Sequence, residues 1–100
     1  DDSAAPPSIE SQALPQSADA EQAARLDLAR TLADIDLPAA LEQYRLMIGA
    51  DSSHLTTVIG DLEKMAQRNT GEKSVRVLLA EALTQAGRMP EAIAIYRSLV

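Results

Sequence analysis

The side chains able to do chemistry are few and scattered along the chain. His54 is the only histidine, and it follows Ser52 and Ser53. A serine nucleophile needs a base and an acid oriented beside it, and a metal site needs several ligands. Because one histidine without a convergent aspartate meets neither need, we interpret His54 as a surface residue and the serines as helix caps.

The carboxylates and glycines offer no clearer site. Asp34 and Asp36 lie close in sequence, as do Asp61 and Glu63, but solvated helix and turn positions explain these pairs. The chain has four isolated glycines, which form no phosphate-binding loop, and it has no cysteine. The sequence therefore predicts no catalytic residues, no cofactor and no metal, and hence no enzyme.

The charge and the hydropathy of the chain limit the kinds of partner that we expect it to bind. The formal net charge is −6, and the nine basic residues form no stripe of the kind that binds nucleic acid or anionic lipid. No apolar run approaches the roughly 20 residues that a membrane span requires. We expect no nucleic-acid partner and no membrane insertion by this segment.

Composition changes sharply near residue 19. Residues 1–18 contain three of the five prolines, among serines, glutamines and alanines. Such a stretch buries too little apolar surface to offset its ordering entropy. We expect residues 1–18 to be a disordered linker and residues 19–100 to be one helical domain.

Five helices are predicted from apolar spacing and from punctuation by proline, glycine and capping residues. The first covers about residues 19–34, the second starts near Pro38 and stops at Gly49, and the third is capped by Asp51 or Ser52. Asn69, Thr70 and Gly71 end the third helix. A fourth covers about residues 73–86, Gly87 makes the next turn, and Pro90 opens a fifth helix with no stop signal before Val100. With 46 % apolar but only 2 % aromatic residues, composition also favours packed helices.

The first and last predicted hairpins repeat one pattern. Leu28, Ala29 and Leu32 recur as Leu79, Ala80 and Leu83 at an offset of 51. At an offset of 52, five more residues recur: Pro38, Ala40, Leu41, Tyr44 and Arg45 correspond to Pro90, Ala92, Ile93, Tyr96 and Arg97. The change of offset falls in the turn that contains Gly87, where a loop tolerates a length difference.

This pattern resembles the tetratricopeptide repeat, most closely from Leu79 and Ala80 through Gly87 to Ala92, Tyr96 and Leu99. Arg76 replaces an aromatic residue, and the spacing of 51 or 52 exceeds the 34 residues of that repeat. We interpret the chain as two full repeats around a degenerate half-repeat. The resemblance implies an all-α fold in which about five antiparallel helices stack as a short α-solenoid.

The resemblance also implies a concave surface that holds a peptide of another protein. Matching positions predict these partner-binding residues: Leu26, Arg30 and Ala33 in the first hairpin, with Ser74, Val77, Glu81 and Thr84 in the last. A clamp for a C-terminal carboxylate is not expected, because Val77, Leu78 and Glu81 cannot donate the necessary hydrogen bonds.

These observations predict a protein–protein interaction module, a scaffold or adaptor, within a larger bacterial protein. The alternative is a self-association domain with a purely structural role, active as a homodimer. It is suggested by the apolar residues Ile93, Leu99 and Val100 of the uncapped last helix.

Overall fold

The computed structural model describes residues 20–50 and 53–100. The predicted linker, residues 1–18, lies outside this part, and so do Asp51 and Ser52, the predicted caps of the third helix.

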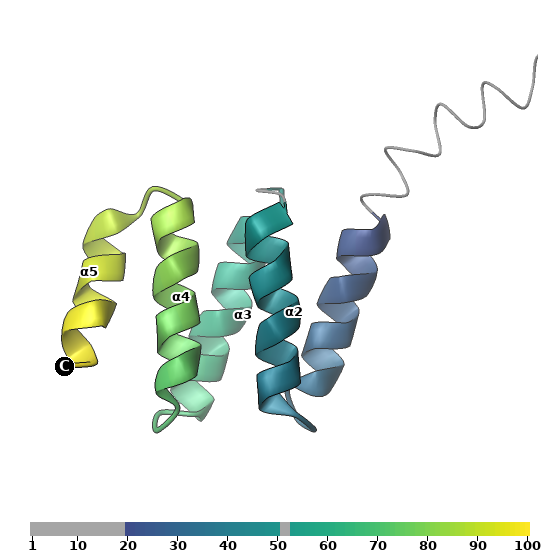
Figure 1. Ribbon diagram of the computed structural model, residues 1–100, viewed down its shortest axis with the longest axis horizontal. Helices are drawn as coiled ribbons and strands as arrows, with labels where there is room; N and C mark the ends of the chain where they lie inside the picture. The colour runs from purple at the N-terminus through teal and green to yellow at the C-terminus, as the bar shows by residue number, and fades with distance from the viewer. Residues whose placement is uncertain (1–19, 51–52) are drawn as a thin grey trace, which may run out of the picture.

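Within the described residues the secondary structure is entirely helical, with five helices and no strand. They are the first helix (20–32), α2 (Leu37–Ala50), α3 (Leu55–Arg68), α4 (Lys73–Gln85) and α5 (Met89–Ser98). Consecutive helices run up and down beside one another (Figure 1). The predicted all-α class and the helix–helix packing are thereby confirmed.

The helices begin and end close to the proline, glycine and capping residues that predicted their ends, with small differences. Pro38 lies in the first turn of α2, and Asn69 ends α3. Gly87, in the turn between α4 and α5, has φ of +78°, a left-handed conformation that glycine adopts without a steric penalty. The helix α2 continues through Gly49 to Ala50, because its backbone hydrogen bonds tolerate a glycine there.

The core consists of aliphatic side chains and one tyrosine. Its largest fully buried members are Tyr44, Met47, Leu62, Met65, Leu78, Leu83, Val58 and Val75. The helix α4 buries six residues and α5 only Ala92. Two of the three methionines fill the core as methionine commonly does, but Met89 is half exposed.

Alanines lie where the helices approach one another. Ala29, Ala40, Ala80 and Ala92 are all fully buried. A methyl side chain lets two helices come closer than a leucine would allow. Through such contacts α4 packs against α3 and α5, and α2 packs against both α3 and α4. Alternate helices therefore touch, as in a two-layer stack.

Candidate functional site

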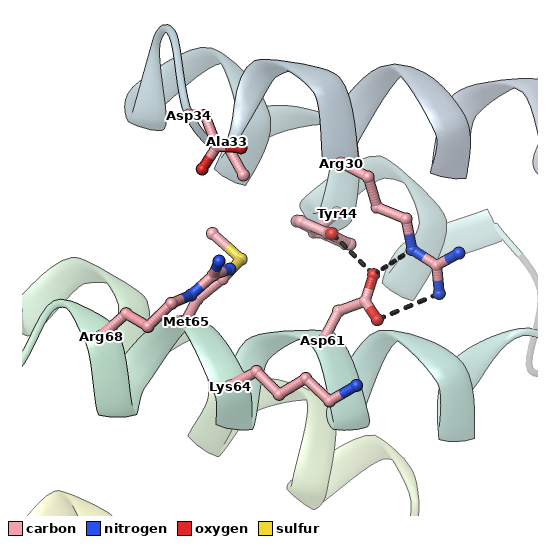
Figure 2. Close-up of a pocket in the computed structure, with 8 residues that line it drawn as sticks. All are labelled: Arg30, Ala33, Asp34, Tyr44, Asp61, Lys64, Met65 and Arg68. Atoms are coloured by element: carbon pink, nitrogen blue, oxygen red, sulfur yellow. Dashed lines mark hydrogen bonds and ion pairs between the residues drawn. The ribbon is translucent and has the colours of Figure 1, made fainter.

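A hydrogen-bonded group of three side chains joins three helices. Asp61 of α3 accepts from the Tyr44 hydroxyl of α2 at 2.7 Å. It also accepts two hydrogen bonds from Arg30 of the first helix, from Nε at 2.8 Å and from Nη2 at 3.1 Å. Both carboxylate oxygens are therefore occupied, and the arginine contact is bidentate. We call these residues the Arg30–Asp61–Tyr44 triad (Figure 2).

The ionisation of the triad follows from its surroundings. Burial alone would raise the pKa of Asp61, but the hydrogen bonds from Arg30 and Tyr44 and the charges of Arg30 and Lys64 outweigh it, so the pKa lies below its ordinary value. Burial, together with the hydrogen bond to Asp61, raises the pKa of Tyr44. Asp61 is thus held as a carboxylate and Tyr44 as a neutral donor.

The triad forms one end of a hollow of about 400 Å³ between the first helix and α3, which we call the cleft. Its lining residues are Arg30, Ala33, Asp34, Tyr44, Asp61, Lys64, Met65 and Arg68. In Figure 2, Ala33 and Asp34 lie across the opening from Met65 and Arg68, with Lys64 along the α3 side. The cleft is therefore lined mainly by charged side chains, with Ala33 and the buried Met65 among them.

Two of the cations at the cleft, Lys64 and Arg68, have no directly bonded partner in the described residues, although the charge of Lys64 acts on Asp61. Both side chains are exposed. They stand four residues apart on α3, so they share a face of the helix. With Arg30 they give the cleft three cations against Asp34 and Asp61, in a chain whose net charge is −6.

The hydrogen bonds and the charge of Asp61 limit the chemistry that this carboxylate could support. Asp61 already accepts three hydrogen bonds and its pKa is low, so it is a poor base. No group of three or more metal-binding side chains occurs in the described part of the chain. Asp61 positions Arg30 and Tyr44, whereas Lys64 and Arg68 make no such bond in the described residues.

The first set of predicted partner-binding residues divides between the cleft and the core. Arg30 and Ala33 line the cleft. Leu26 packs among the core residues and is only 9 % exposed.

The second set lies elsewhere. Ser74 lines a different hollow, of about 430 Å³, between α2 and α4. Glu81 pairs with Arg45 of α2 at 3.0 Å, and the Thr84 hydroxyl donates to the Ala80 carbonyl at 2.9 Å. Val77 is half buried. Neither of the two hollows is lined by residues of both predicted sets.

Sequence reasoning missed Lys64, Arg68 and the polar role of Tyr44. It was wrong to interpret Asp61 as a solvated position, because this side chain is largely buried and accepts three hydrogen bonds. Because the chain was interpreted as two full repeats around a half-repeat, the predicted partner-binding residues came from the first helix and α4. In the structure, α3 is the helix that lies across the cleft from the first helix. The spacing of Lys64 and Arg68 was a usable signal, because two bases four residues apart form a cationic face on any helix.

Comparison with known protein families, curated proteins and solved structures gives no match to this chain. The fold and the cleft therefore define its class directly: a small stack of antiparallel helices with a polar cleft near one end. None of the described helices has the length and apolarity needed to cross a membrane.

Proposed function

We propose that this chain is a protein-interaction module of the tetratricopeptide-like kind, and that its cleft receives a segment of another protein. The internal repeat and the stacked antiparallel helices support this proposal. It places the module, as a scaffold or adaptor, within a larger bacterial protein.

The observation that carries the proposal is the pair of cations, Lys64 and Arg68, at the rim of a pre-organised cleft. The triad fixes the first helix against α3, so the hollow between them keeps its shape. Lys64 and Arg68 remain free to pair with carboxylates or carbonyl groups of a bound segment. A rigid recess with free donors at its rim matches the preorganisation that favours peptide binding.

Peptide selection tests the proposal without a known partner. A random peptide library displayed on phage is selected on the immobilised chain, and enriched peptides are titrated by fluorescence polarisation. The variant Lys64→Glu reverses one rim charge, and Lys73→Glu makes the same charge change at an exposed position outside the cleft. We expect Lys64→Glu to weaken binding about tenfold or more and Lys73→Glu to change it less than twofold.

Peptides that bind both variants alike would contradict a role for the cleft. Circular dichroism and urea denaturation of both variants serve as the folding control, because Lys64→Glu also removes a charge that acts on Asp61 of the triad.

A further inference from the structure

The helices α2 and α5 carry the same sequence pattern, and only one of them is covered. Residues 37–48 align with residues 89–100 at the constant offset of 52. Leu41 and Tyr44 of α2 are 8 % and 1 % exposed, whereas their equivalents Ile93 and Tyr96 of α5 are each 42 % exposed. Two helices of one chain thus present the same face in two different environments.

The covered copy shows what such a face binds. The helix α3 packs on α2 and brings the Asp61 carboxylate to the Tyr44 hydroxyl at 2.7 Å. The helix α4 also packs on α2 and brings the Glu81 carboxylate to Arg45 at 3.0 Å. The face of α2 is therefore completed by helices that combine apolar contacts with carboxylates.

The uncovered copy retains both donors. Tyr96 and Arg97 correspond to Tyr44 and Arg45, and neither side chain has a hydrogen-bond partner or an ion pair in the part of the chain that the structure describes. Beside them Met89 and Ile93 are 48 % and 42 % exposed. Met89, Ile93 and Tyr96 lie at spacings of four and three, which places them on one side of α5. We call Met89, Ile93, Tyr96 and Arg97 the α5 face.

We propose that the α5 face docks an amphipathic helix of a partner protein that carries carboxylates beside its apolar residues. One of these carboxylates accepts from Tyr96, as Asp61 of α3 accepts from Tyr44. This goes beyond the function proposed above, because α5 stands at the opposite end of the stack from the first helix and the cleft (Figure 1).

The chain itself supplies a probe for this surface. A synthetic peptide of residues 54–69 reproduces α3, including Asp61, and a hydrocarbon staple replacing the exposed Glu63 and Gln67 holds it helical. It is titrated into the full ¹⁵N-labelled chain and followed by amide chemical shifts. We expect the shifts to concentrate on α5.

Substitutions in the chain and in the peptide identify the residues that contact each other. Tyr96→Phe in the chain and Asp61→Asn in the peptide each weaken binding about fivefold, the effect of one lost hydrogen bond, and together they weaken it no further than either alone. Ile93→Asp abolishes binding. Ser98→Asp places the same charge at an exposed position on another side of α5 and leaves binding unchanged.

Three results would overturn the proposal. The first is an absence of shifts, or shifts confined to the cleft or α2. The second is independent, additive effects of Tyr96→Phe and the peptide substitution. The third is a doubling of the chain's own mass in analytical ultracentrifugation that Ile93→Asp abolishes, because the occupant of the α5 face would then be a second copy.

Discussion

Asp61 connects the first helix, α2 and α3 through three hydrogen bonds, although it lies on the partly exposed side of α3. Replacing it with asparagine removes the charge but keeps the shape, so Arg30 loses its ion pair and Tyr44 its charged acceptor. We expect Asp61→Asn to lower the free energy of unfolding by about 1–3 kcal/mol. Urea denaturation at pH 7 measures this loss. Glu63→Gln, an exposed neighbour on α3, is the matched control, and equal midpoints for the two variants would contradict the importance of the triad.

The triad also makes stability depend on pH. The pKa of Asp61 is lowered by folding, so its contribution is complete above the ordinary value of about 3.9 and is lost as pH falls through the lower, folded pKa. We expect the wild type to lose stability below about pH 4 more steeply than Asp61→Asn. Thermal melts from pH 2 to pH 7 test this, and parallel curves for the two proteins would exclude it.

The ionisation of Tyr44 predicts how the stability of the fold changes at alkaline pH. Its pKa is raised by folding, so its contribution is present below the ordinary value of about 10 and is lost as pH rises through the folded pKa. We expect Tyr44→Phe to be less stable than the wild type at pH 7 by about 1 kcal/mol and to show a smaller difference at high pH. Urea midpoints at pH 7 and above pH 10 measure it, and a constant difference would show that Tyr44 contributes through packing alone.

At this scale the repeat predicted which residues correspond better than it predicted their surroundings. Tyr44 and Tyr96 occupy equivalent positions of the repeat, but Tyr96 is 42 % exposed, whereas Tyr44 is fully buried. Its hydroxyl partner, 17 residues away, depends on the rotation of α3, which local spacing does not determine. The same holds for Arg30, whose acceptor is 31 residues away.

Individual helices are set mostly by local signals, which is why their number and approximate bounds were predictable. Gly87 and Asn69 end helices as expected. Which helices pack against one another was harder to predict from the sequence. Whether α3 or α4 lies across the cleft depends on which faces meet, and the apolar residues of α3 form a face broad enough for several neighbours.

Two glycines provide a paired test at the scale of the element. A Cβ at Gly87 or at Gly60 meets no atom within 4 Å, so neither substitution creates a clash. Gly87→Ala must hold a positive φ and should destabilise by about 1–2 kcal/mol. Gly60→Ala, inside α3, should stabilise by about 1 kcal/mol through helix propensity. Chemical denaturation of both variants measures the two changes, and changes of equal sign would contradict the assigned turn and helix.

Across the whole molecule, burial is unevenly distributed along the stack. The helix α4 buries six residues, whereas α5 buries only Ala92. Local opening requires less free energy where fewer apolar contacts break. We expect the amides of α5 to exchange hydrogen for deuterium faster than those of α4, as measured by mass spectrometry of peptic peptides. Equal protection of the two helices would indicate that the stack opens only as a single unit.

The two tyrosines stand in contrasting surroundings and give the chain its own optical reporters. Tyr44 is buried and donates to a carboxylate, an arrangement that quenches phenol emission, while Tyr96 is partly exposed. With no tryptophan in the chain, its ultraviolet emission comes from these two rings. A rise in emission from Tyr44 would report the separation of α2 from α3, and a change at Tyr96 would report contact at the far end of the stack. One cuvette measurement on Tyr44→Phe and Tyr96→Phe variants therefore separates unfolding from docking without any attached dye.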